Sequence, residues 1–305
     1  MIYTITLNPA IDFIVRLDTL NIGEVNRMTS DDKFPGGKGI NVSRLLNFLG
    51  TPTTALGFLG GFTGKFIEEK LQAEGICSDF TTIKQDTRLN IKLNADGETE
   101  INGAGPNITE TEIQVFLQKL NQLTSEDIVI LSGSAPKSLG NEFYQQIIKK
   151  IKERQAAFVI DVEGQMLINS LVFEPLLIKP NHYELAAMFE THFETKEEMI
   201  PYAKELLKLG SKHVLISMGG AGALMITKDA VYFAEPIKRE VKNSVGAGDS
   251  MVAGFVDEFV KTQDALRAFK MGVACGSASA FCDDLASRAL IEKVLEFVHI
   301  VKISE

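Results

Sequence analysis

The sequence predicts an α/β fold with a mostly parallel central sheet and a small, separate β-sheet. From Thr109 onward, short and wholly apolar segments alternate with amphipathic helical ones, which is typical of a parallel sheet covered on both faces. Around Arg88 the pattern changes to alternating polar and apolar residues, which predicts a sheet with one polar face. The 305 residues contain no linker or repeat. We therefore expect one domain, residues 1–305, in which the small sheet forms a lid.

The first segment of the chain predicts two short strands with a carboxylate between them. Ile2–Leu7 is rich in β-forming residues and ends at the turn signal Asn8-Pro9, and a second strand is expected over Phe13–Leu17. Asp12 lies between the two strands. At such a position open α/β sheets place ligand-binding groups, but the residue equally fits a local Asx turn.

A glycine-rich loop leads into the first predicted helix. Phe34–Gly39 contains three glycines and Lys38, and Asn41 lies at the start of an amphipathic helix that Gly50 ends. This is not a phosphate-binding Walker loop, because a glycine and not a hydroxyl residue follows Lys38. Three glycines, a lysine and an asparagine at a helix start suit a polyhydroxylated, phosphorylated ligand.

Residues of about 12–30 and 87–102 are expected to form the lid. Gly23–Met28 is polar enough for an exposed edge strand, and the alternating segment that begins at Arg88 continues through an Asp-Gly turn as a hairpin. We expect Arg88 to point toward the ligand and Lys92 to lie in solvent.

The remaining elements follow in alternation. Before the lid hairpin we expect strand Thr53–Leu59, helix Gly64–Glu74 and strand Phe80–Ile83. After it the pattern predicts helix Thr109–Leu120, strand Ile128–Leu131, helix Asn141–Lys152, strand Phe158–Val162, helix Glu163–Leu171, strand Leu176–Ile178, helix Lys196–Leu209, strands Val214–Ser217, Val231–Ala234 and a short one at Val241, and helices near Asp257–Lys261, Asp264–Phe281 and Ala289–Val298.

Polar groups follow several of the buried strands. They include Ser132–Ser134, Asp161 and the Lys179–Glu184 segment. Functional groups gather at the carboxyl ends of parallel strands in this architecture. Asn181 and Glu184 are three residues apart at a helix start. That spacing suits both a hydrated Mg²⁺ near phosphates and a simple capping interaction.

Two further glycine-rich segments follow predicted strands. Met218–Leu224 contains three glycines after a strand, which allows close approach of a planar or phosphate-bearing ligand. Asn243–Phe255 bends at Gly246 and Gly248 and then continues as a small-residue helix whose first amides form an anion site. Asp249 repels an anion there unless it serves as a general base toward an attacking hydroxyl; otherwise it is an acidic residue favoured by the helix dipole.

Composition excludes several classes of function. The net charge of −9 disfavours a nucleic-acid scaffold. The three cysteines form no metal or disulfide pattern, and the histidines His182, His192, His213 and His299 lack metal spacing. Without a leader or an apolar run of membrane-spanning length, a cytoplasmic location is expected. Hydrolase, zinc-protease and dinucleotide motifs are missing from the sequence.

Three segments together resemble the ribokinase-like (PfkB) carbohydrate kinases. They are Phe34-Pro-Gly-Gly-Lys-Gly-Ile-Asn-Val-Ser, Lys179-Pro-Asn-x-x-Glu184 and Val245-Gly-Ala-Gly-Asp-Ser, and the resemblance covers essentially the whole chain. It implies a three-layer α/β/α fold, a lid that also serves as a homodimer interface, and the use of ATP with Mg²⁺. Within the family, the kinases of fructose 1-phosphate are most similar and those of tagatose 6-phosphate are near relatives.

The resemblance also implies roles for individual residues. Asp249 matches the catalytic base, beside the amides of Gly246, Ala247 and Gly248. Sugar-phosphate contacts match Asp12, Arg27, Gly37, Lys38, Asn41, Arg88 and Ser134. The nucleotide side matches Lys179, Asn181, Glu184, Ser217, Gly219, Gly220, Gly222 and Gly248, with Asn181 and Glu184 holding Mg²⁺ through water.

The expected reaction is ATP-dependent phosphorylation of a ketohexose phosphate, with fructose 1-phosphate giving fructose 1,6-bisphosphate. A tagatose-6-phosphate kinase is the alternative within the family. A sugar-phosphate-binding protein without turnover would be expected to lose Asp249 or the Gly-Ala-Gly segment, and both are present. A nucleoside or ribose kinase would have no use for the cations Arg27, Lys38 and Arg88.

Overall fold

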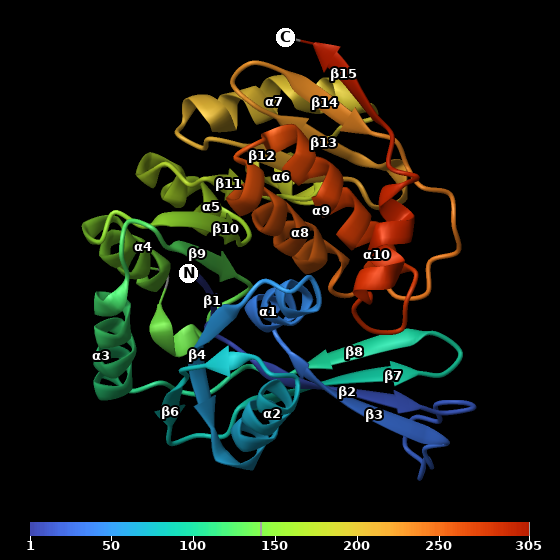
Figure 1. Ribbon diagram of the computed structural model, residues 1–305. Coiled ribbons are helices and arrows are strands. Elements are labelled where there is room, and N and C mark those ends of the chain that lie inside the picture. Colours follow the sequence, from blue (N-terminus) through green and yellow to red (C-terminus); the bar gives the residue numbers. More distant parts are fainter. Residues whose placement is uncertain (141, 305) are drawn as a thin grey trace.

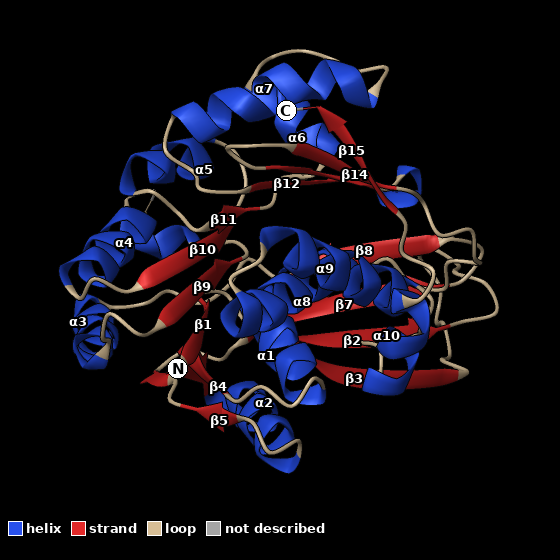
Figure 2. Ribbon diagram, turned by 45° about the horizontal axis from the view of Figure 1, so that its top comes forward, coloured by secondary structure: helices blue, strands red, loops and turns tan. Residues whose placement is uncertain are grey.

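Short apolar strands assemble into one large, twisted sheet at the centre of the molecule (Figures 1 and 2). The computed structural model describes residues 1–140 and 142–304. The strand order is β15-β14-β13-β12-β11-β10-β9-β1-β4-β5, with β6 also paired to β4, and the pairs from β12 to β5 are parallel. The strands are β1 Ile2–Thr6, β4 Thr53–Gly60, β5 Cys77–Ser78, β6 Thr81–Ile83, β9 Ile128–Ser132, β10 Ala157–Asp161, β11 Leu177–Ile178, β12 Val214–Ser217, β13 Ala223–Ile226, β14 Val231–Ala234 and β15 Ile300–Ser304.

Helices cover both faces of this sheet, so the predicted three-layer arrangement is confirmed. One face packs against α1 Lys38–Phe48, α8 Ala247–Thr262, α9 Ala265–Ala280 and α10 Arg288–Leu295, which lie together in front of the sheet in Figure 1. The other face packs against α3 Glu110–Lys119, α4 Phe143–Glu153, α5 Gln165–Ser170, α6 His182–Met188 and α7 Lys196–Lys208, while α2 Gly61–Ala73 packs beside β4. No helix in the described ranges is both long and apolar enough to cross a membrane.

Strand residues alternate between the two cores, as the pleat of a β-strand requires. In β9, Ile130 belongs to the core beneath α8 and α9, whereas Val129 and Leu131 belong to the opposite core. Because the side chains on both faces of these strands are buried, each strand appears in the sequence as a continuous apolar run. This double burial explains why their positions could be predicted.

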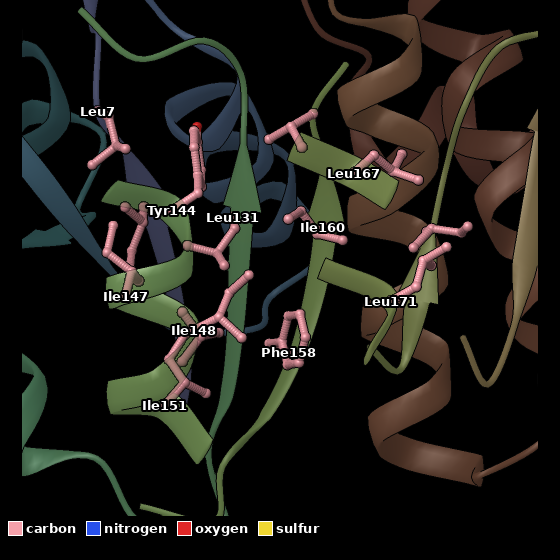
Figure 3. Packing of buried hydrophobic residues seen from close by; sticks show 14 of the residues in the cluster. Leu7, Leu131, Tyr144, Ile147, Ile148, Ile151, Phe158, Ile160, Leu167 and Leu171 are labelled. Atoms are coloured by element: carbon pink, nitrogen blue, oxygen red, sulfur yellow. The ribbon is translucent and has the colours of Figure 1, made fainter. Parts of the chain in front are cut away.

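Helix α4 shows how the second layer is fixed (Figure 3). Its residues Tyr144, Ile147, Ile148 and Ile151 recur at helical spacing and pack on β9 and β10. The Tyr144 hydroxyl donates a hydrogen bond to the Gly133 carbonyl oxygen at 2.7 Å, directly after β9. The core therefore anchors the loop that leaves the carboxyl end of this strand.

The small sheet contains four strands in the order β3-β2-β7-β8, namely β2 Ala10–Arg16, β3 Ser30–Gly36, β7 Arg88–Asn94 and β8 Glu98–Asn102. In Figure 1 it extends away from the central sheet below α10. Asp12 lies inside β2, opposite Asn90 of β7, and not in a connecting turn. The predicted edge strand Gly23–Met28 is wrong. That segment is a loop in which the Asn26 side chain bonds the backbone of Asn21, and the edge strand is the polar stretch Ser30–Gly36.

Several other features differ from the sequence expectations. Strands β5, β13 and β15 were not predicted, Val241 lies in no strand, and α8 runs unbroken from Ala247 to Thr262. Strand β13 begins directly after the glycine-rich turn, so only four residues mark it, and β15 is an exposed edge strand. The predicted helix start at Asn141 lies outside the described residues.

Candidate functional site

A cavity of about 840 Å³ opens where the carboxyl ends of the central strands meet the small sheet and the N-terminus of α8. Residues from all three predicted glycine-rich segments and from both predicted ligand sides line it. They are Asp12, Gly37, Lys38, Asn41, Arg88, Ser134, Lys179, Asn181, Glu184, Ser217, Gly219, Gly220, Gly222, Gly246, Ala247, Gly248 and Asp249. Arg27 is the exception, because it lies on the exposed loop between β2 and β3 and does not line the cavity of its own chain.

Asp249 is a buried carboxylate on the first turn of α8. Its Oδ2 atom accepts a hydrogen bond of 2.8 Å from Nδ2 of Asn41, which comes from α1. Burial and, to a lesser extent, the negative charge of Asp161 raise the pKa of Asp249 to about 6, against the opposing effects of Lys38 and the Asn41 hydrogen bond. No ion pair to Asp249 is present within the described ranges. The group is thus a carboxylate whose proton affinity is close to that required of a base near neutral pH.

The loop before α8 and the first turn of the helix supply only part of the expected set of amides, Gly246, Ala247 and Gly248, because the Ala247 amide is already bonded. Gly246 is the N-cap with φ +76°, a conformation that favours glycine, and the Asn243 side chain accepts a hydrogen bond of 2.9 Å from the Val245 amide. The Ala247 amide donates to the Ser244 carbonyl oxygen at 3.3 Å. Within the described part of the chain, the amides of Gly246, Gly248 and Asp249 make no hydrogen bond, so these three are available to an anion.

A buried aspartate, Asp161, forms ion pairs with two lysines that line the cavity. Asp161 Oδ1 lies 3.3 Å from Lys179 Nζ, and Oδ2 lies 3.5 Å from Lys38 Nζ. Burial alone would raise the pKa of Asp161, but Lys179 and Lys38 together lower it below its ordinary value. Likewise burial would lower the pKa of Lys38, whereas the carboxylates of Asp161 and Asp249 raise it. The sequence indicated only that Asp161 follows a strand; its pairing with both lysines depends on three separate elements.

The wall formed by the small sheet is polar and partly unsatisfied. Arg88 donates to the carbonyl oxygens of Asn8 (3.2 Å) and Gly103 (2.8 Å), and Asn90 donates to Asp12 Oδ1 at 3.1 Å. Burial raises the pKa of Asp12. The buried oxygens Asn8 Oδ1 and Asn90 Oδ1 have no hydrogen-bond partner, and buried polar groups of this kind call for a ligand or water.

Lys92 corrects a sequence expectation. It was expected in solvent, but it is only 8% exposed, lines the cavity and lies 3.5 Å from the Glu100 carboxylate. Its neighbours in β7 alternate as predicted; the error is that the polar face of the small sheet faces the cavity and not solvent. A second lid cation is therefore available beside Arg88.

Asn181 and Glu184 form the capping interaction that the sequence allowed. Asn181 Oδ1 accepts from the Glu184 amide at 2.8 Å, and Glu184 Oε2 accepts from the Asn181 amide at 2.7 Å. Both residues also line the cavity, and burial raises the pKa of Glu184. The second carboxylate oxygen of Glu184 takes no part in this box, so the pair can still hold a hydrated divalent ion. No cluster of three His, Cys, Asp or Glu residues suited to direct metal binding occurs among the described residues.

The far end of the cavity is apolar. Its lining includes Pro236, Ile237, Val241, Val245, Val273, Gly276 and Phe281. Gly276 and Ser277 lie on α9, where the small side chains leave room beside the helix. The cavity therefore has a polar end at the small sheet, a cationic and amide-lined middle, and an apolar end suited to a planar ring.

Known proteins resemble this chain in sequence and in fold. Residues 3–289 match the model of the pfkB family of carbohydrate kinases. The 1-phosphofructokinase of Bacillus subtilis (strain 168) is 45% identical over 99% of this chain and 100% of its own length, and the D-tagatose-1-phosphate kinase of Bacillus licheniformis is 36% identical over 98% and 99%. Escherichia coli phosphofructokinase-2 superposes with a TM-score of 0.91 at 27% identity over 97% of this chain and 98% of its own, both in complex with fructose-6-phosphate and in its tetrameric inhibited form.

Proposed function

Because the chain belongs to the pfkB family of carbohydrate kinases, we propose that it transfers the γ-phosphoryl group of ATP to the 6-hydroxyl of fructose 1-phosphate, which gives fructose 1,6-bisphosphate. The observation that carries this proposal is Asp249, a buried carboxylate with raised proton affinity between the polar wall of the lid and unpaired amides at the start of α8. A hydroxyl that enters from the lid side meets the base, and a phosphate that enters from the other side meets the amides.

In the proposed mechanism Asp249 orients the acceptor hydroxyl and takes its proton as the bond to phosphorus forms. Asn41 holds the carboxylate in place, so little reorganisation is needed during the transfer. The amides of Gly248 and Asp249 stabilise negative charge on the transferring group, and Lys38 lies close enough to Asp249 to influence its charge. Asp12 and Asn90 form hydrogen bonds with hydroxyl groups of the sugar. Arg88 and Lys92 neutralise the charge of the substrate phosphate.

Kinases of this family use ATP and typically a divalent metal, and we propose Mg²⁺ held through water by Asn181 and Glu184. Such an ion would supply positive charge that neutralises the phosphate groups of ATP. Lys179 contributes a fixed positive charge on the same side, and the turn Gly219–Ala221 and Gly222 offers backbone approach to the nucleotide. The adenine ring fits the apolar end of the cavity.

The small sheet is proposed to close over the sugar site and to form a homodimer. Its surface carries exposed apolar side chains at Leu89 and Ile101, and the loop between β2 and β3 exposes Ile22 and Val25. Paired lids would cover such residues. A related phosphofructokinase-2 forms a tetramer, so assembly occurs in the family. A sedimentation mass of one chain under assay conditions would contradict the dimer.

The function is tested by ATP-dependent turnover on five acceptors side by side: fructose 1-phosphate, tagatose 1-phosphate, tagatose 6-phosphate, fructose 6-phosphate and free ribose. We expect the highest kcat/KM with fructose 1-phosphate, and ribose should be poor because remote phosphate binding contributes to orientation. Tagatose 1-phosphate is the second candidate, since a relative with that activity is 36% identical. Equal use of free ribose would contradict the proposal.

The pH dependence of kcat/KM follows from the environment of Asp249. A base works deprotonated, and its pKa is about 6, so activity should fall as the pH drops through about 6 and not through about 4, where an ordinary Asp titrates. The Asn41 hydrogen bond lowers this pKa, so Asn41→Ala should move the acid limb to higher pH. A sugar phosphate also ionises near pH 6. Its ionisation is the same with both enzymes, so an unmoved limb in the variant would contradict the assignment to Asp249.

Replacing Arg88 by Ala should chiefly weaken binding of the sugar phosphate. The lid arginine is held by two carbonyl oxygens and faces the cavity, so its loss removes a positioned cation but leaves the base intact. We expect KM for the sugar phosphate to rise by roughly ten- to a hundredfold while KM for ATP stays nearly constant. Steady-state kinetics with each substrate varied in turn decides this, and an unchanged KM for the sugar phosphate would reject the role.

A further inference from the structure

Arg44 is a buried arginine on α1 that the proposed mechanism does not use. Its guanidinium group bridges two carboxylates from distant parts of the chain. Nε donates to Glu74 at 2.9 and 3.2 Å, while Nη1 and Nη2 donate to the two oxygens of Asp284 at 3.1 and 2.8 Å. The side chain of Arg44 is 5% exposed, whereas those of Glu74 and Asp284 are 25% and 36% exposed, so a buried guanidinium is paired with two partly exposed carboxylates. Two-pronged pairing of this kind fixes direction as well as distance.

The two partners lie in different surroundings. Glu74 is the C-cap of α2, at the edge of the central sheet and outside the cavity lining. Asp284 belongs to residues 282–287, the backing loop, which connects α9 to α10. One half of the Arg44 interaction therefore ties α1 to α2, and the other half ties α1 to the backing loop.

The backing loop contacts residues 243–248, which we call the glycine loop. The Asp283 carbonyl oxygen accepts a hydrogen bond of 2.9 Å from the Asn243 side chain, which in turn holds the Val245 amide. A Cβ atom added to Gly246 would lie 3.0 Å from Cδ2 of Leu285, so these two residues are packed closely. Thus Asp284 is flanked by Asp283 and Leu285, two residues of the backing loop that contact the glycine loop.

Helix α1 already fixes one half of the site, because Asn41 holds the Asp249 carboxylate. Arg44 lies one turn further along the same helix. We infer that Arg44 is a positioning residue: through Asp284 it holds the backing loop against the glycine loop, so that α1 sets the position of the base and of the phosphate-binding amides together. This inference deepens the proposed function and rests on it for its kinetic consequence.

The effect on catalysis follows from alignment. The amides of Gly248 and Asp249 stabilise transferring charge only if they hold their position relative to the base. Release of the backing loop would let residues 243–248 move without removing any group that touches a substrate. The loss should therefore appear in kcat, while the sugar-phosphate wall at the small sheet remains unaffected.

The test compares Asp284→Ala with Glu74→Ala in the full-length protein. Both variants remove a carboxylate from the same guanidinium and leave the other to compensate its charge, so each is the matched control of the other. We expect Asp284→Ala to lower kcat about tenfold or more with KM for the sugar phosphate nearly unchanged. Glu74→Ala should keep kcat within about twofold, although it lowers the melting temperature comparably.

A second readout does not depend on turnover. Amide hydrogen exchange, followed by mass spectrometry, should accelerate in the peptide covering residues 243–250 for Asp284→Ala but not for Glu74→Ala. Equal effects of the two variants on kcat and on exchange would show that Arg44 only stabilises the fold, and would overturn the inference. Wild-type kcat and exchange in Asp284→Ala would overturn it as well. If the wild-type protein phosphorylated no sugar phosphate, the proposed function would be contradicted. The exchange comparison would still decide whether Arg44 positions the glycine loop.

Discussion

Asp249→Asn is expected to lower kcat by roughly two to four powers of ten and to leave both KM values nearly unchanged. The substitution keeps the shape of the side chain, and an amide oxygen can still accept the hydrogen bond from Asn41. What it removes is the ability to take a proton from the acceptor hydroxyl. Steady-state kinetics with fructose 1-phosphate and ATP measures the effect directly.

The structure supplies a matched control for this variant. Asp257 is a second buried aspartate on α8, but it bonds Thr51 and Lys261 and does not line the cavity. Asp257→Asn should lower the melting temperature and keep kcat within about twofold. Asp249→Asn should instead keep or raise the melting temperature, because it removes a buried charge that Asp161 repels. Near-normal turnover in Asp249→Asn would remove the base assignment and with it the proposed mechanism.

Local chemistry made most of the fold predictable. The apolar runs of β9, β10 and β12 and the stripe of α4 are each determined by burial of their own side chains, so a few consecutive residues suffice to recognise them. Strand β3 is different. Its residues Ser30–Lys33 are polar, and backbone pairing with β2 alone makes it a strand. Nothing in the local pattern distinguishes such an edge strand from the adjacent loop.

The candidate site was predictable where one segment carries the chemistry and not where distant segments meet. The amides before α8 and the pair Asn181 and Glu184 could be found, because a glycine-rich helix start and an i, i+3 spacing are local signals. The inward direction of Lys92 depends on how the small sheet is oriented above the cavity. Arg44 meets Asp284 across 240 positions of the chain, and no spacing rule connects them.

The buried position of Asp161 predicts a second large effect, on stability. Asp161→Asn leaves the ammonium group of Lys179, a side chain that is only 6% exposed, without a carboxylate partner. The side chain of Lys38 is 33% exposed, so water can partly solvate its charge after the substitution. Removing one member of a buried ion pair costs about 3–5 kcal/mol, which for a chain of this size corresponds to a fall in melting temperature of roughly 10 °C. Calorimetry or thermal unfolding followed by circular dichroism at pH 7 measures it.

The pH dependence gives this prediction its sign. The folded-state pKa of Asp161 lies below the ordinary value, so its contribution to stability is complete above the unfolded-state pKa of about 4 and is lost as the pH falls through the folded-state value. The difference in melting temperature between wild type and variant should therefore narrow at acid pH. Since the Asp161 charge also raises the pKa of Asp249, the acid limb of kcat/KM in Asp161→Asn should move to lower pH, opposite to the shift expected for Asn41→Ala. A shift of both variants in the same direction would contradict the electrostatic coupling of these two aspartates.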